Sequence, residues 1–178
     1  MGNLLAGHIA VVTGGGSGIG RAISRGYAAE GATVAVADVN EAGAAETVAM
    51  IEHDSGVARS YALDVTDRDA CKVFAASVAR DFGPVSILVN NAGIVRREKI
   101  TAPDADADWD AVISVNLMGP YNVPTAFLDA LKQTKGRIVN LGSIQSALPT
   151  GNALALTAPT TTRLGFTQPR APGLWPGG

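Results

Sequence analysis

Cysteine is almost absent from the sequence: Cys71 is the only one among 178 residues. A single cysteine excludes an intrachain disulfide and a zinc site built on several thiolates, and two histidines are too few for most other metal sites. We therefore expect no bound metal, and the cytoplasm is the expected compartment. Cys71 falls in a helical pattern, where a cysteine is more often packed than reactive.

Long apolar runs are also missing. No stretch approaches the roughly 18 consecutive apolar residues that a membrane span needs. The first ten residues lack the basic segment that is typical of a signal peptide. The formal net charge is only -2, which gives no reason to expect nucleic acid or an anionic membrane as a partner.

Aromatic residues make up only 5% of the chain, whereas 47% of its residues are hydrophobic. There is enough apolar material for a packed core, and that core should consist mainly of alanine, valine, isoleucine and leucine. The length suits one domain.

Short β-rich runs alternate with longer helical patterns along the first 145 residues. The expected strands are 8–12, 33–37, 57–63, 86–90 and 137–141. The expected helices are 18–29, 41–54, 67–82 and 106–131, and we allow for two pieces in the last because Pro120 and Pro124 interrupt it. This alternation predicts βαβ units with right-handed crossovers. The fold class is therefore α/β, with a doubly wound parallel sheet and helices on both faces.

A glycine-rich segment, TGGGSGIG at 13–20, follows the first expected strand and opens the first expected helix. Its glycines let the backbone turn tightly and approach a pyrophosphate, whose charge then faces the amides of the helix N-terminus. The spacing is G-x-x-x-G-x-G rather than the commoner G-x-G-x-x-G, and the alternative is a plain flexible turn. The flanking strand and helix favour a dinucleotide-binding loop in a Rossmann-type fold.

Asp38 ends the second expected strand. A carboxylate at this place can accept hydrogen bonds from the adenosine ribose hydroxyls, and it would repel a 2′-phosphate. No basic residue follows at Val39 or Asn40, which favours NAD over NADP. The alternative is that Asp38 caps the helix expected from Glu41, and the two roles are compatible.

The segment NNAG at 90–93 makes the pattern specific. Together with the glycine-rich segment, it resembles the short-chain dehydrogenase/reductase family of the NAD-dependent type. Further landmarks agree in order and spacing: Asp64 and Val65 after the third expected strand, Asn116 in SVNLMG, and Ser143 in RIVNLGSIQS. The resemblance covers about residues 5–148 and continues weakly to Thr167.

The resemblance implies cofactor-binding roles at the matching positions. The pyrophosphate would be held by residues of the glycine-rich segment: Gly14, Ser17, Gly18, Ile19 and Gly20. Asp38 would hold the ribose, and Asp64 with Val65 would contact the adenine. The cofactor cleft would be lined by Asn90, Asn91, Ala92 and Gly93.

The implied reaction is NAD-linked hydride transfer between a secondary alcohol and a ketone. Ser143 would hydrogen-bond the small-molecule substrate, and Asn116 would anchor a water in the proton relay. The alternatives are that Ser143 only terminates a strand and that Asn116 only satisfies buried backbone groups. The resemblance also implies a homo-oligomer built on helices near Asn116 and near Leu156.

The family also uses a tyrosine as acid/base and a lysine four residues later that lowers its pKa. Counting from Ser143, these positions hold Leu156 and Thr160. No shift of register restores the pair, because the last tyrosine is Tyr121 and the last lysine is Lys135. An NAD-binding or regulatory module without turnover is therefore the alternative function. A sequence error, a deliberate alteration and a natural non-catalytic relative remain open as explanations.

The composition changes after residue 145, and five of the nine prolines lie in the last 30 residues. Pro159 and Pro169 interrupt any helix there, and 170–178 has no periodicity. We therefore expect a dinucleotide-binding Rossmann domain over 1–148, and a degenerate active-site helix region with a disordered tail over 149–178. The resemblance further implies that the sheet is incomplete at its C-terminal end.

Overall fold

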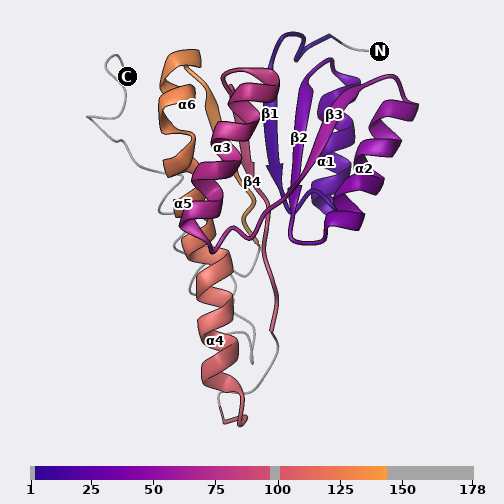
Figure 1. Ribbon diagram of the computed structural model, residues 1–178. Helices are drawn as coiled ribbons and strands as arrows, with labels where there is room; N and C mark the ends of the chain where they lie inside the picture. The colour runs from indigo at the N-terminus through magenta and orange to yellow at the C-terminus, as the bar shows by residue number, and fades with distance from the viewer. Residues whose placement is uncertain (1–2, 97–100, 144–178) are drawn as a thin grey trace.

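Five parallel strands form one sheet in the order β3-β2-β1-β4-β5 (Figure 1). The computed structural model describes residues 3–96 and 101–143. Its strands are β1 (Ile9–Thr13), β2 (Thr33–Asp38), β3 (Val57–Ala62), β4 (Ile87–Asn90) and β5 (Arg137–Asn140). The predicted α/β fold, with a Rossmann-type doubly wound parallel sheet, is confirmed.

Helices cover both faces of this sheet (Figure 1). On one face lie α1 (Gly18–Ala29) and α2 (Glu41–His53). On the other lie α3 (Arg68–Phe82), α5 (Gly119–Ala126) and α6 (Leu128–Thr134). Between β4 and α5, α4 (Ala105–Ile113) and a π-helical segment, η1 (Ser114–Met118), extend past the edge at which the strands end.

The central strands are buried on both faces, which explains why most of their residues are apolar. In β1, Val11 packs toward α3, α5 and α6, whereas Ala10 and Val12 pack toward α1 and α2. Successive side chains of a strand point to opposite faces, so a strand covered on both sides needs a continuous apolar run. β5 is less covered, and its Ile138 and Val139 are each 40% exposed.

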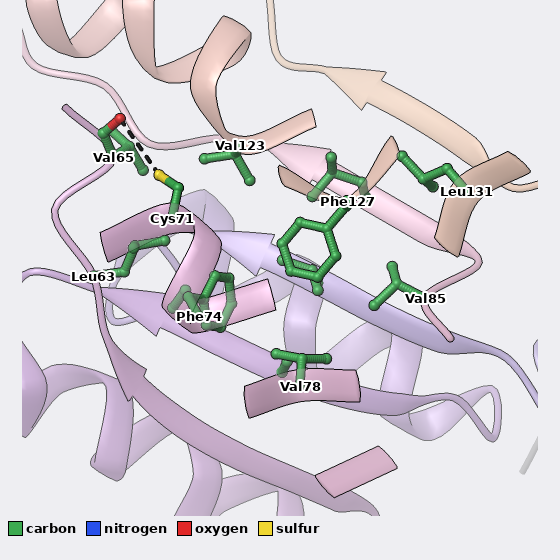
Figure 2. Close-up of a cluster of buried hydrophobic side chains, with 13 residues drawn as sticks. Leu63, Val65, Cys71, Phe74, Val78, Val85, Val123, Phe127 and Leu131 are labelled. Carbon is green, nitrogen blue, oxygen red and sulfur yellow. Dashed lines mark hydrogen bonds between the residues drawn. The ribbon is translucent and has the colours of Figure 1, made fainter. Parts of the chain in front are cut away.

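The core between the sheet and α3 is built around aromatic rings, although the sequence has few of them (Figure 2). The Phe74 ring lies edge-on to Tyr61, with centroids 5.1 Å apart, and to Phe127, at 5.4 Å. Such edge-to-face pairs are favoured by the ring quadrupole. The predicted aliphatic core therefore describes the α1 and α2 face well, while the opposite face adds two buried phenylalanines.

The helical pattern at 106–131 is divided at two places. It changes to π geometry at Ser114–Met118, and Pro120 follows this change in the first turn of α5. It breaks again at Phe127, after Pro124 within α5. Asp67, expected in the first turn of α3, is its N-cap and accepts from the amides of Asp69 and Ala70 at 2.9 Å.

The expectations for the C-terminal region lie outside the described residues. They concern the region 149–178, with Leu156, Thr160 and Pro159, and the tail at 170–178. Among the described residues, no helix combines the length and apolar character that crossing a membrane requires.

We expect Phe74→Ala to lower the free energy of unfolding by about 3–5 kcal/mol, because it removes the ring that joins Tyr61 to Phe127 and leaves a cavity. Urea denaturation measures the change. Its control is Val73→Ala on the same helix, where the side chain is 68% exposed and the effect should stay within about 0.5 kcal/mol. Equal losses in the two variants would contradict this description of the core.

Candidate functional site

The order of the strands places a crevice at the carboxyl ends of β1 and β4. From β1 the chain continues outward to β2 and β3, whereas β4 and β5 lie on the other side of β1. In open parallel sheets, ligands bind outside the carboxyl ends of the strands at such a switch point. A cleft of about 510 Å³ lies at this place, and all the predicted cofactor-binding residues except Gly20 and Asn90 line it.

The glycine-rich loop depends on glycine at three of its positions. Gly14 and Gly18 have φ angles of +64° and +50°, a region that residues with a Cβ rarely adopt. A Cβ at Gly20 would collide with the carbonyl oxygen of Gly14. Gly20 is not among the residues that line the cleft: its missing side chain leaves room for the Gly14 carbonyl where α1 begins, and its contact with a pyrophosphate stays a prediction.

The N-terminus of α1 opens toward the cleft without a capping side chain. Ser17 is the N-cap and makes no side-chain capping hydrogen bond, and the first turn holds no acidic residue. A Cβ at Gly18 would meet nothing within 4 Å, and Ile19 is 66% exposed. Helix N-termini carry partial positive charge and unpaired amides, so this arrangement fits an anionic group such as a pyrophosphate.

Asp38 lines the cleft at the end of β2. Its Oδ2 accepts from the amide of Gly16 at 2.8 Å and its Oδ1 from the amide of Asn40 at 2.9 Å. The helix cap of α2 is Asn40, whose Oδ1 accepts from the Gly43 amide at 3.1 Å. The capping role considered for Asp38 therefore belongs to Asn40. An ionised carboxylate has about four acceptor positions, so Asp38 can still accept from hydroxyls.

Asn91 ties the end of β4 to the glycine-rich loop. Its Nδ2 donates to the carbonyl oxygens of Thr13 and Gly14, both at 3.0 Å. The Thr13 hydroxyl accepts from the amides of Asn91 and Ala92 at 3.1 Å and donates to the Val89 carbonyl at 3.2 Å. These bonds fix the loop against the segment that forms the opposite wall of the cleft.

Asn90 is not among the described residues that line the cleft, although the resemblance implied that it would be. It is only 2% exposed, and its Nδ2 donates to Oδ1 of Asn140 on β5 at 2.8 Å. The two consecutive amides thus bond to different neighbours, Asn90 to Asn140 and Asn91 to the carbonyls of Thr13 and Gly14. Asn90 therefore joins β4 to β5, while Asn91 joins β4 to the loop after β1.

The turn after β3 is held from behind by α5. Asp64 accepts from the amide and the hydroxyl of Thr66, at 2.9 and 2.7 Å. The buried Asn122 donates to the carbonyl oxygens of Val65 and Thr66, at 3.1 and 3.3 Å. Sequence reasoning did not single out Asn122, although a polar residue among the apolar positions of a helix indicates a buried hydrogen-bond partner.

Cys71 lies behind the same turn (Figure 2). Its Sγ donates to the Val65 carbonyl over 3.8 Å, and the side chain is buried. Burial and, to a lesser extent, the nearby Asp67 and Asp64 carboxylates together raise the pKa of the Cys71 thiol to about 11. The thiol is therefore neutral near pH 7 and packs the wall of the cleft, in agreement with the packing role expected for it.

The two residues expected to take part in catalysis differ in their surroundings. Asn116 is 3% exposed, and its amide group pairs with Ile94: Oδ1 accepts from the Ile94 amide and Nδ2 donates to its carbonyl, both at 2.8 Å. These bonds match the backbone-satisfying alternative for Asn116. Ser143 is exposed and follows β5. Leu156 and Thr160 lie outside the described residues.

Four apolar residues that sequence reasoning missed also line the cleft: Val39, Leu63, Ile94 and Val115. Each is a direct chain neighbour of a residue that the motifs identified. Their apolar side chains supply the surface that flat rings need beside polar anchors. Within the described part of the chain, no group of His, Cys, Asp or Glu is placed to hold a metal ion.

We expect Asn91→Asp to lower the free energy of unfolding by about 2–3 kcal/mol, because a carboxylate oxygen would then face the Thr13 and Gly14 carbonyls where Nδ2 donates now. Urea denaturation at neutral pH measures the loss. Asn40→Asp is the matched control, since Asn40 uses its oxygen to cap α2 and aspartate caps equally well. Wild-type stability in Asn91→Asp would show that the amide does not hold the loop.

A family model described as short chain dehydrogenase matches residues 8–168. A 3-oxoacyl-acyl-carrier-protein reductase (FabG) from Thermotoga maritima is 40% identical over 141 residues, which is 79% of this chain and 57% of that protein. A D-threitol dehydrogenase from Mycolicibacterium smegmatis is 39% identical over 143 residues, covering 78% of this chain and 54% of the relative. The chain thus spans little more than half the length of these curated relatives.

A solved structure shows the same architecture. The crystal structure of a metagenomic short-chain oxidoreductase in complex with NADP superposes with a TM-score of 0.84 and 35% sequence identity. The match covers 91% of this chain and 74% of that one.

Proposed function

Because this chain belongs to the short chain dehydrogenase family, we propose that its cleft binds a nicotinamide dinucleotide and that the whole protein is an oxidoreductase acting on CH–OH groups. The bound dinucleotide would accept a hydride from a secondary alcohol or supply one to a ketone. The uncapped start of α1 would bind the pyrophosphate, and the turn at Asp64 and Val65 would contact the adenine.

The cofactor that we propose is NAD(H), and the position of Asp38 is the observation that carries this choice. Its carboxylate lines the cleft and is held by two backbone amides, so it presents acceptor oxygens to ribose hydroxyls. A 2′-phosphate would bring further negative charge to that carboxylate. Among the described residues that line the cleft, no lysine or arginine is present to compensate. The NADP of the structural relative is therefore the competing cofactor to test.

The substrate that we propose is a small-molecule alcohol or ketone. The names of the relatives describe a reductase of 3-oxoacyl groups and a dehydrogenase of a polyol. Both reactions convert a carbonyl group and a CH–OH group into one another. Ser143 would hydrogen-bond this oxygen. Asn116 would anchor a water of the proton relay in addition to its pairing with the Ile94 backbone. We further propose that the protein is cytoplasmic, as its single cysteine suggested, and a homo-oligomer, as the family resemblance implies.

A second function is favoured by the sequence around Leu156 and Thr160. Neither residue can perform proton transfer as a tyrosine with a neighbouring lysine does, since leucine has no ionisable group and threonine carries no charge. The alternative is a module that binds NAD(H) without turnover. Binding and turnover therefore have to be measured separately.

For binding, we expect NADH to bind at least about tenfold more tightly than NADPH, equal to 1.4 kcal/mol. Asp38→Ala should narrow this ratio, because the variant loses both the ribose acceptor and the repulsion of the 2′-phosphate. Fluorescence titration of each reduced nucleotide measures both affinities. Asp54→Ala, which removes a carboxylate at the far end of α2, is the control for net charge and should leave the ratio unchanged. Equal affinity of the unaltered chain for both nucleotides would show that Asp38 does not select the cofactor.

For turnover, the double variant Leu156→Tyr with Thr160→Lys restores the acid/base pair of the family. We expect it to oxidise secondary alcohols at least about a hundredfold faster than the unaltered chain, within the range that a positioned acid/base contributes. NADH formation across a panel of polyols and hydroxyacyl compounds reports the rate. Substantial turnover by the unaltered chain would refute the module without turnover. No turnover in the double variant, with NADH still bound, would count against the proposed chemistry at these positions.

A further inference from the structure

Arg21 connects three parts of the molecule that meet behind the cleft. It lies in the first turn of α1, and its side chain is 24% exposed. Its Nη2 donates to the Gly16 carbonyl and to Oε2 of Glu46, both at 2.6 Å, and its Nε donates to the hydroxyl of Thr47 at 3.0 Å. The guanidinium therefore joins the glycine-rich loop to α2, and its charge is paired with that of Glu46.

Thr47 extends the same connection to the preceding peptide. Thr47 is fully buried, and its hydroxyl lies 2.9 Å from the Gly15 carbonyl oxygen and 3.0 Å from that of Gly43, the two acceptors within reach of its single proton. The Gly15 carbonyl and the Gly16 amide belong to one planar peptide group, so fixing the oxygen also orients the N–H. That N–H donates to Oδ2 of Asp38 at 2.8 Å. Arg21 and Thr47 thus hold the carbonyls on either side of the amide that Asp38 accepts from.

The space around Gly16 makes this arrangement sensitive to small shifts. A Cβ at Gly16 would lie 2.9 Å from Oδ2 of Asp38, and one at Gly43 would lie 2.9 Å from the Gly16 carbonyl oxygen. Glycine at both positions lets the loop, the first turn of α2 and the carboxylate approach one another. If the loop were displaced, the Gly16 amide would move away from the Asp38 carboxylate, or the loop would press against α2.

We propose that Arg21 is a positioning residue for cofactor selectivity: it fixes Gly16, and through Gly16 it fixes the carboxylate of Asp38 toward the ribose. This rests on the proposed binding of NAD(H). Arg21 is not among the described residues that line the cleft, so it acts through the loop and not by touching the nucleotide. Its ion pair with Glu46 also commits the charge of Arg21, which is then not available to a 2′-phosphate.

The chain offers a matched comparison one turn further along α1. Arg25 also joins α1 to α2, through Oδ2 of Asp54 at 2.9 Å, and both side chains are about half exposed. In the described part of the chain, its hydrogen bond goes to α2 and not to the glycine-rich loop. If Arg21 only held the two helices together, removing the Arg25 side chain should change the affinities for NADH and NADPH to a similar extent.

The test compares Arg21→Met, Arg21→Lys and Arg25→Met in NADH and NADPH titrations. We expect Arg21→Met to weaken NADH binding about tenfold, equal to 1.4 kcal/mol, and NADPH binding much less, so that the selectivity ratio falls. Arg21→Lys should recover part of the ratio, because an ammonium keeps the charge but not the fork geometry. Arg25→Met should change neither affinity by more than roughly twofold, as expected for an exposed surface position.

A second readout needs no nucleotide. The Gly16 amide should exchange its hydrogen faster in Arg21→Met than in the unaltered chain or in Arg25→Met, because its bond to Asp38 is loosened. If Arg21→Met does not fold, the isosteric Thr47→Val removes the bond to the Gly15 carbonyl and should give the same loss of selectivity.

Three results would overturn the proposal, each for a different reason. Equal weakening of NADH and NADPH by Arg21→Met and Arg25→Met would reduce Arg21 to a structural role. Unchanged Gly16 exchange in Arg21→Met would show that the guanidinium does not hold the loop. Failure of the unaltered chain to bind either nucleotide would overturn the proposed function itself, while amide exchange would still decide whether Arg21 fixes Gly16.

Discussion

The bond between the Asn91 amide and the loop after β1 is the constraint on which the site depends. It joins the ends of two strands that are adjacent in the sheet but 78 residues apart in the chain, and Thr13 reinforces it with its own hydroxyl. Without this connection the glycine-rich loop would have no fixed relation to the opposite wall of the cleft. The sheet order brings the two strand ends together, and the hydrogen bonds then set the distance between them.

The helices on the two faces of the sheet support different parts of the cleft. On the α1 and α2 face, backbone groups of the loop are held by Arg21 and Thr47, and this orients the amide that meets Asp38. On the other face, Asn122 of α5 holds the carbonyls of the turn after β3. Side chains that never line the cleft therefore support both ends of the region proposed for the adenosine moiety. Preorganised support of this kind is what makes a binding site selective.

Local patterns in the sequence predicted most of the fold. The helix at Gly18–Ala29 and the strands at the centre of the sheet depend on nearby residues: glycines that permit the turn, and apolar runs buried on both faces. Residues whose partners are remote escaped prediction. Arg21 bonds to Thr47 across 26 positions and Asn122 to Val65 across 57, so no local pattern reveals either contact. The partners of Asn90 and Asn91 could not be predicted either. The neighbouring strands decide that Asn90 bonds to Asn140 and Asn91 to the loop after β1.

The central claim is that the cleft between the glycine-rich loop and the segment after β4 receives NAD(H). Amide chemical shifts of the labelled chain, recorded during a titration with NAD⁺, test it most directly, because they locate the ligand without requiring turnover. We predict the largest changes at Gly18, Ile19, Val39 and Ala92, which line the cleft from three of its sides. Saturable changes confined to another surface, such as the groove that Ala75, Ala79 and Ala130 line between α3 and α6, would contradict the account. So would no changes at millimolar NAD⁺.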